Sequence, residues 1–186
     1  GDVDRNDVER QLSRWTRSGK LVQVRRGLYA LAPPFRKVEP HAFLIANRLY
    51  SPSYVSLESA LSYYGLIPEG VYSVTSMSSA KTARFQTPVA DFVYRNVRPH
   101  LLFGYQLKQI GGQGYKIAEI EKAILDYLYF HPNIVRKEDF YEWRFNGGEF
   151  LARADMLKLR EYARAYQRKS FCLRLETLLR LIANTK

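Results

Sequence analysis

The stretch RQLSRWTRSGKLVQVRRGLYAL, residues 10–31, sets a basic helical run, a glycine and a basic hairpin directly beside one another. Val8, just upstream, and Leu12 and Trp15 within the stretch recur at spacings of four and three residues, which places them on one side of an α-helix. The spacing predicts an amphipathic helix over residues 4–18. Trp15 on this apolar stripe is interpreted as a packing residue rather than as a stacking platform.

The ends of this helix and the element after it have their own signals. Asp4 can act as N-cap, and Gly19 is suited to end the helix. The next residues, 21–31, alternate as strand, turn and strand, with Gly27 supplying the permissive turn backbone. The prolines after residue 32 end the hairpin, because proline cannot continue a strand ladder. We therefore expect a helix followed by a two-stranded wing.

The side of the helix opposite the apolar stripe is polar and basic. A helix of this kind fits the DNA major groove, and a wing can reach phosphates or the adjacent minor groove. Guanidinium groups suit both tasks because they present several fixed donors. The alternative from these features alone is an ordinary solvated surface. The residues predicted to contact DNA are Arg5, Asn6, Arg10, Ser13, Arg14 and Arg17 on the helix, and Arg25 and Arg26 on the wing.

Charge and composition limit the classes of protein to which the sequence can belong. The formal net charge is +11, and residues 1–37 and 136–186 each carry a net +5, against +1 for residues 38–135. Such clustering favours a polyanionic partner. With one cysteine, a disulfide or thiolate metal cluster within one chain is not expected. No apolar run approaches the roughly 20 residues of a membrane span, and residues 1–10 are polar, so we expect a soluble cytoplasmic protein with no membrane partner.

The rest of the chain predicts an α+β protein. β-branched and aromatic runs indicate an antiparallel sheet of about four or five strands, and helical spacing returns after it. We expect a partial winged helix-turn-helix over residues 1–36 and a second domain over 37–186. Within that second domain we expect short helices at 40–50 and 55–64, the sheet at about 71–116, and helices at about 118–184, namely 120–130, 137–146, 154–167 and 170–183.

Several patterns that resemble catalytic or metal motifs fail on spacing. The three histidines, at positions 41, 100 and 131, lie too far apart for a local metal motif. The glycines at 111–114 lack the Gly-Lys-Ser/Thr of a phosphate loop. A metal-dependent nuclease would place acidic ligands before an E-x-K element, a spacing that Asp91, Glu119, Glu121 and Lys122 do not give. We therefore expect no metal, no cofactor and no catalytic residue.

Two further residues are interpreted as structural, and one region stays open. Asp126 lies in an apolar helical run and is expected to cap or pair inside the fold, and Cys172 is expected to pack. The basic side chains of the last helices form either ordinary solvated faces or a second anion-binding surface. Such a surface would add contacts to DNA or bind nucleic acid held by a partner protein. This second basic surface comprises Lys158, Arg160, Arg164, Arg168 and Lys169, with Arg153, Arg174 and Arg180 in the same region.

Three segments together carry a family resemblance. DVERQLSRWTRSGKLVQVRRGLYALAPP (7–34) resembles the recognition helix and wing of the AbiEi family of antitoxins and transcriptional regulators. SPSYVSLESALSYYGLIPE (51–69) is similar to the family's entry into its C-terminal domain. GYKIAEIEKAILDYLYFHP (114–132) is similar to the strand and helix that follow its sheet. The resemblance covers about residues 3–135.

The resemblance implies a non-enzymatic protein with two tasks. Its winged helix would repress its own operon by binding operator DNA with inverted repeats, with a homodimer on the DNA as one arrangement. Its C-terminal domain would counteract a nucleotidyltransferase-type toxin, with or without direct contact, in abortive infection. The alternatives are a nucleic-acid-processing enzyme with an unrecognised site and a purely protein-binding module.

The resemblance also has one departure. A winged helix normally places two helices before its recognition helix, and these cover the apolar stripe. Here the sequence starts three residues before Asp4. We therefore expect a shortened form in which Val8, Leu12 and Trp15 pack on the C-terminal domain or on a second chain, or stay partly exposed. DNA binding is expected to be weaker than in the parent protein.

Overall fold

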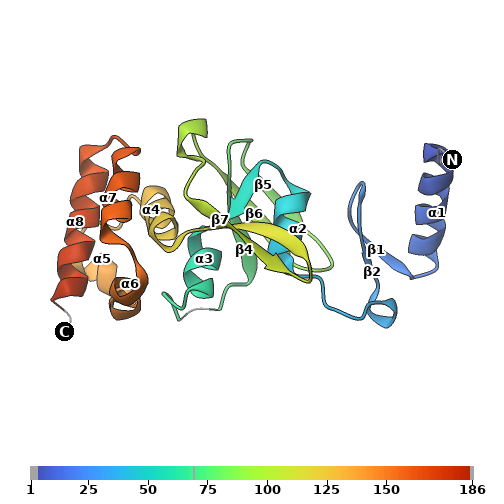
Figure 1. The fold of residues 1–186 in the computed structure, drawn as a ribbon, viewed down its shortest axis with the longest axis horizontal. Helices are drawn as coiled ribbons and strands as arrows, with labels where there is room; N and C mark the ends of the chain where they lie inside the picture. The colour runs from blue at the N-terminus through green and yellow to red at the C-terminus, as the bar shows by residue number, and fades with distance from the viewer. Residues whose placement is uncertain (1–3, 69, 185–186) are drawn as a thin grey trace.

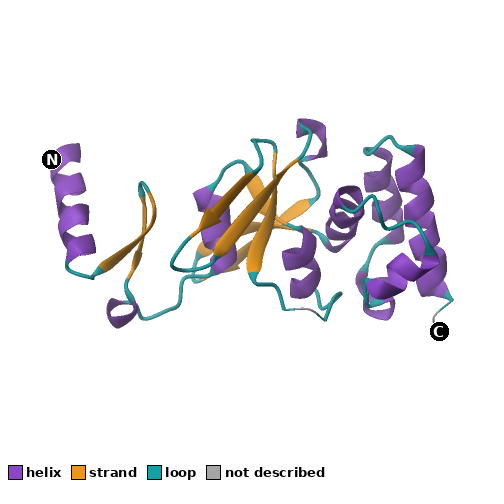
Figure 2. Ribbon diagram, turned by 180° about the vertical axis from the view of Figure 1, so that it is seen from behind, coloured by secondary structure: helices purple, strands orange, loops and turns teal. Residues whose placement is uncertain are grey.

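The computed structural model describes residues 4–68 and 70–184, and it confirms the α+β class. The chain is extended along one axis (Figure 1). One end holds α1 (Arg5–Arg17) and the hairpin of β1 (Leu21–Arg25) and β2 (Leu28–Leu31). A sheet occupies the middle, and helices form the other end, as the view from behind also shows (Figure 2).

The N-terminal helix and hairpin form as the sequence predicts. The Asp4 carboxylate accepts a hydrogen bond from the Asn6 N–H at 3.0 Å, so Asp4 is the N-cap. Gly19, just after the helix, has φ +69°, which favours glycine, and Gly27 in the hairpin turn has φ +80°. The two strands pair antiparallel. A helix followed by a wing, the second half of a winged helix-turn-helix, is therefore present.

The central sheet has six strands in the order β5-β6-β4-β3-β8-β7. The expected antiparallel sheet is wrong in part, because the sheet is mixed: β4 runs parallel to β6, and β3 runs parallel to β8. The remaining pairs are antiparallel. The strands are β3 (Ser53–Val55), β4 (Ser73–Ser78), β5 (Ala83–Gln86), β6 (Asp91–Asn96), β7 (Tyr105–Ile110) and β8 (Gln113–Ala118).

Two local features explain the mixed topology. The β5–β6 hairpin folds back so that β6, not β5, lies beside β4. The short strand β3 then separates β4 from β8 and pairs with both. Sequence spacing assigned part of this strand to the helix at 55–64, which in the structure is α3 and starts only at Leu57.

The helices follow the expected order with one difference. The predicted helix at 137–146 is shorter, and an unpredicted helix, α6, follows it, because Asn146 caps a new helix by accepting from the Glu149 N–H at 3.1 Å. The helical elements after β2 are η1 (Pro33–Phe35), α2 (Ala42–Leu49), α3 (Leu57–Tyr63), η2 (Pro99–Leu101), α4 (Ile120–Phe130), α5 (Lys137–Glu142), α6 (Gly147–Arg153), α7 (Met156–Arg164) and α8 (Lys169–Ala183).

Helix α4 joins the sheet to the C-terminal helices through a buried polar cluster. Asp126 Oδ2 accepts from Tyr54 OH at 2.9 Å and from Ser56 Oγ at 2.8 Å, both in or just after β3. Asp126 Oδ1 accepts from Tyr166 OH at 2.9 Å, beyond α7, and from Lys122 Nζ. Lys122 and Asp126 are fully buried. The expectation that Asp126 pairs inside the fold is confirmed.

Arg174 also acts inside the fold. Its side chain is 8% exposed, and Nη1 donates to the carbonyls of Leu128 and His131 at 2.9 Å each, so the guanidinium caps the C-terminal end of α4. Its inclusion in the basic region of the last helices is therefore corrected: this charge is buried. The packing assigned to Cys172 is corrected as well, because its side chain is exposed.

Candidate nucleic-acid interface

Helix α1 stands apart from the sheet at the end of the molecule (Figure 1). None of its residues is buried. On its apolar stripe, Val8 is 42% and Trp15 is 40% exposed, and Leu12 is half-buried. Of the alternatives expected for this stripe, partial exposure is the one found within the described chain.

The polar face of α1 is a single continuous surface. Five of the residues predicted to contact DNA line one shallow depression with an open mouth. Glu9 lies in the same depression and was not predicted. Arg5 is not part of its lining. The five predicted residues are Asn6, Arg10, Ser13, Arg14 and Arg17.

Acidic side chains beside this face reduce its positive charge but do not neutralise it. Arg5 Nε lies 3.4 Å from Glu9 Oε1, and Arg10 Nη1 lies 3.7 Å from Asp7 Oδ1. All four side chains of these pairs are at least 66% exposed. Exposed pairs of this kind contribute little free energy, so their arginines can exchange a carboxylate for a phosphate. Arg17 has no ion-pair partner among the described residues, which makes its charge fully available.

The two wing arginines differ in their contacts. Arg25 Nη1 donates to the Leu49 carbonyl, at the end of α2, at 2.9 Å, and its guanidinium lies 4.5 Å from the centre of the Phe85 ring. Arg25 therefore fastens the wing to the sheet, where Val24 is also buried in the core. Arg26 is exposed at the hairpin turn. Arg25 is exposed as well, so the two arginines differ in their partners and not in their exposure.

In the second basic surface, too, some side chains contact other parts of the fold and others are exposed. Lys158 Nζ lies 3.4 Å from Glu119 Oε1, so it holds α7 against the start of α4. The Arg168 guanidinium lies 5.4 Å from the centre of the Tyr129 ring. Arg160 and Arg164 are exposed one turn apart on α7, and Lys169 is exposed at the start of α8. Within this surface these three side chains and Arg168 are exposed, and so are Arg153 and Arg180 of the same region.

The acidic residues weighed as nuclease ligands have structural partners. Glu119 Oε2 accepts from Tyr162 OH at 2.6 Å, and Glu121 Oε1 accepts from the Asp155 N–H at 2.7 Å. Burial, together with the hydrogen bond to the Glu119 carboxylate, raises the pKa of Tyr162 well above its usual range. Among the described residues, no group of three or more His, Cys, Asp or Glu side chains could hold a metal ion.

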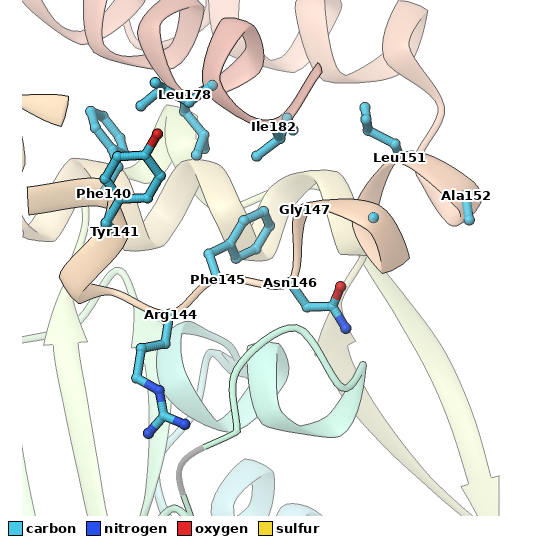
Figure 3. A pocket seen from close by; sticks show the side chains of 12 residues that line it. Phe140, Tyr141, Arg144, Phe145, Asn146, Gly147, Leu151, Ala152, Leu178 and Ile182 are labelled. Atoms are coloured by element: carbon cyan, nitrogen blue, oxygen red, sulfur yellow. The ribbon is translucent and has the colours of Figure 1, made fainter. Parts of the chain in front are cut away.

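A cavity of about 770 Å³ lies between α5, α6 and α8. Its lining is mostly apolar: Phe145 points toward Leu178 and Ile182, whereas Arg144 points to the opposite side (Figure 3). Asn146, at its edge, is already used as the cap of α6. The lining therefore offers no acid–base pair for catalysis.

No helix in the described ranges combines the length and apolar character of a membrane span. A search of curated proteins gives no match. A comparison with protein-family models matches residues 4–32, which are α1 and the hairpin, to the family described as "Transcriptional regulator, AbiEi antitoxin". This match confirms the resemblance over residues 4–32, where the N-terminal helix and wing of the chain are similar to those of the AbiEi antitoxin and transcriptional-regulator family.

Proposed function

We propose that the protein is a DNA-binding transcriptional autorepressor and an antitoxin that counteracts a nucleotidyltransferase-type toxin. The observation that carries the DNA-binding part is the exposed polar face of α1, where Arg10, Arg14 and Arg17 share one depression. An α-helix that stands clear of the body can enter the major groove, and the exposed Arg26 on the wing can meet the flanking backbone. Its place of action would be the cytoplasm, where operator DNA lies.

We propose the following set of DNA contacts. Arg5, Asn6, Arg10, Ser13, Arg14 and Arg17 would face the duplex from α1, and Arg26 from the wing. Arg25 would position the wing, since its guanidinium is engaged by Leu49 and Phe85. Roughly six phosphate contacts would make log affinity fall with log salt at a slope of about −5. On an operator with inverted repeats, two copies would bind as a homodimer.

The test is fluorescence anisotropy with a labelled duplex taken from the DNA upstream of the protein's own gene. The double variant Arg10→Gln/Arg17→Gln is expected to bind more weakly and to lower the magnitude of the salt slope by about 2, since each lost contact removes about 0.9. The matched control, Lys81→Gln/Arg98→Gln, removes the same charge from exposed positions in the sheet region. Equal losses in both variants would refute a specific role for α1.

The antitoxin part is proposed for residues 37–186. Co-expression with the neighbouring toxin gene, scored by growth, tests it directly. Arg10→Gln/Arg17→Gln is expected to rescue growth when the antitoxin is expressed from an independent promoter, because the substitutions leave that region intact. Failure of the unaltered protein to rescue growth would refute the antitoxin proposal.

The exposed arginines of α7 and α8 are proposed as an accessory anion-binding surface. Arg160→Glu/Arg164→Glu is expected to weaken operator affinity or toxin neutralisation. If neither changes in the two assays above, these side chains form a solvated face only. Metal-dependent turnover of DNA or RNA by the purified protein would instead favour the enzymatic alternative.

A further inference from the structure

A small cavity of about 190 Å³ opens beside the first turn of α8. Its other side is formed by the C-terminal end of α4 and the residues that follow, namely Tyr129, Pro132 and Val135. None of the described residues that line the cavity is acidic, whereas two are arginines, Arg168 and Arg174. The cavity therefore presents positive charge, and its complement is an anion.

Arg174 is the fixed part of this lining. Its Nη1 donates to the carbonyls of Leu128, His131 and Ile134 at 2.9, 2.9 and 3.5 Å, which holds the guanidinium in place. Its other nitrogens, Nη2 and Nε, have no hydrogen-bond partner among the described residues, and neither is closed off from solvent. No carboxylate in the described chain pairs with this largely buried charge. The donors that remain are therefore available to a ligand in the cavity that Arg174 lines.

The first turn of α8 adds positive charge at the same place. Its N-cap residue, Arg168, makes no capping hydrogen bond through its side chain, and the turn holds no acidic residue. The first N–H groups of a helix have no partner within it and carry partial positive charge, so anions are favoured at this end. Here Arg168 and Lys169 place two full positive charges there instead. A bound anion would relieve this local conflict.

We infer that this cavity binds a phosphate group with three free oxygens, as in a phosphate monoester. Such a group carries a charge of about −1.5 to −2 and three strong acceptor oxygens. These match the two guanidinium groups and the hydroxyl group of Ser170, which also lines the cavity. A carboxylate has a single charge and two oxygens, so it would leave part of this donor set unused.

The size of the cavity and its rim indicate how the rest of the ligand lies. Pockets that enclose a whole drug-sized molecule measure about 300–1,000 Å³, so this smaller cavity holds the phosphate and leaves the organic part outside. Val135 and Leu173, which also line it, are 54% and 66% exposed. They form an apolar shelf on which the organic part of a monoester would rest.

This site goes beyond the accessory surface proposed above. That surface consists of exposed side chains that would meet a DNA backbone, whereas the cavity is lined in part by the buried Arg174. A backbone phosphate of DNA is esterified on two sides and has only two free oxygens. A monoester has one ester bond, so its phosphate can enter a small cavity. The ligand class is therefore a small phosphorylated molecule, and its binding is measured without DNA.

Isothermal titration calorimetry tests the site with adenosine 5′-monophosphate, adenosine and inorganic phosphate as probes. Salt at about 0.15 M screens the exposed charges of the protein. The unaltered protein is expected to bind the monophosphate and not adenosine, because the phosphate is the group recognised. Tighter binding of the monophosphate than of inorganic phosphate identifies an ester as the occupant, and equal affinity identifies the free anion. No binding of either phosphate compound, or equal binding of adenosine, overturns the inference.

Variants locate the binding in the cavity. Arg168→Gln is expected to raise the Kd for the monophosphate about tenfold, because a charge-assisted hydrogen bond is lost. Ser170→Ala is expected to raise it less, since a neutral donor is removed. The matched control Arg180→Gln removes the same charge from an exposed position at the far end of α8 and should leave the Kd unchanged. Equal losses in Arg168→Gln and Arg180→Gln would show unspecific attraction to a basic protein and refute the site.

Two further choices keep the test independent of the fold and of DNA binding. Arg174 is retained in every variant because it holds the end of α4, and circular dichroism checks that each variant folds. Arg10→Gln/Arg17→Gln, which alters α1, is expected to bind the monophosphate like the unaltered protein. A failure of the DNA-binding proposal would therefore leave this result unaffected.

Discussion

Replacing Asp126 by Asn should lower the free energy of unfolding by about 3–5 kcal/mol. The carboxylate is fully buried and is the counter-charge of the equally buried Lys122. Asparagine has nearly the same shape, but one of the two oxygens becomes an NH2 group that cannot accept. Either the Tyr54 and Ser56 hydroxyls or the Tyr166 hydroxyl therefore lose their acceptor, and the ammonium group is left uncompensated. At about 2–4 °C per kcal/mol, the loss should be plain in a thermal melt.

The reverse substitution should cost less. Lys122→Met leaves Asp126 charged, yet the carboxylate still accepts from three hydroxyl groups, so about 2–3 kcal/mol is expected. In the double variant Lys122→Met/Asp126→Asn neither charge is buried. Its cost should therefore fall short of the sum of the single costs by about 2 kcal/mol. Urea denaturation of the four proteins measures this coupling, and additive costs would refute the electrostatic account.

The pH dependence gives an independent check. Burial lowers the pKa of Lys122 from its ordinary value of 10.5, while the Asp126 charge opposes that effect. In Asp126→Asn the opposing charge is lost, so the pKa of Lys122 falls further. At pH values between that lowered pKa and 10.5, Lys122 is protonated more often in the unfolded chain than in the folded chain. The free energy of unfolding of the variant should therefore rise with pH relative to that of the wild type. A difference that is constant with pH would point to altered packing.

Other positions give equally direct predictions. Arg174→Leu should destabilise by about 2–3 kcal/mol, measured by urea denaturation, because buried carbonyls at the end of α4 lose their donor. Gly147→Ala should cost about 1–3 kcal/mol, because its methyl group would lie 2.5 Å from Ile182 Cγ2, and Ile182→Ala should offset part of that cost. Hydrogen bonds from the N–H groups of Val135 and Arg136 lower the pKa of Asp139 below its ordinary 3.8. The ionised Asp139 carboxylate therefore stabilises the fold fully above pH 3.8, and this contribution is lost as the pH falls through the lowered pKa. The stability difference between wild type and Asp139→Ala, followed by circular dichroism, should therefore vanish at low pH.

Sequence reasoning succeeds where the signal is local. The N-cap at Asp4, the glycine after α1, and the alternation of β1 and β2 each depend on neighbouring residues, so helix and wing follow from the sequence. The polar face of α1 follows from helical spacing, and the structure gathers five of its predicted residues in one depression. Their contact with DNA remains a prediction.

Helix α6 is missed although its cap at Asn146 is local, but the other missed features depend on partners distant in the sequence. Strand β3 has three residues, too few for a period, and it is a strand because β4 and β8 flank it. Lys122 reads as an ordinary helix-surface lysine, and its burial depends on Tyr166, 44 residues later. Arg25 likewise reads as a wing residue aimed at DNA, while its nearest partner is the carbonyl of Leu49. Spacing alone carries no information about such contacts.

The charged edges of the sheet limit how readily molecules can join. Unprotected strands at both ends would let copies add one after another into a fibre, because every addition would present a fresh end. Here both outer strands carry a charged side chain, Arg84 on β5 and Lys108 on β7, which discourages pairing with a further strand. The sheet can thus end in two open strands without polymerising.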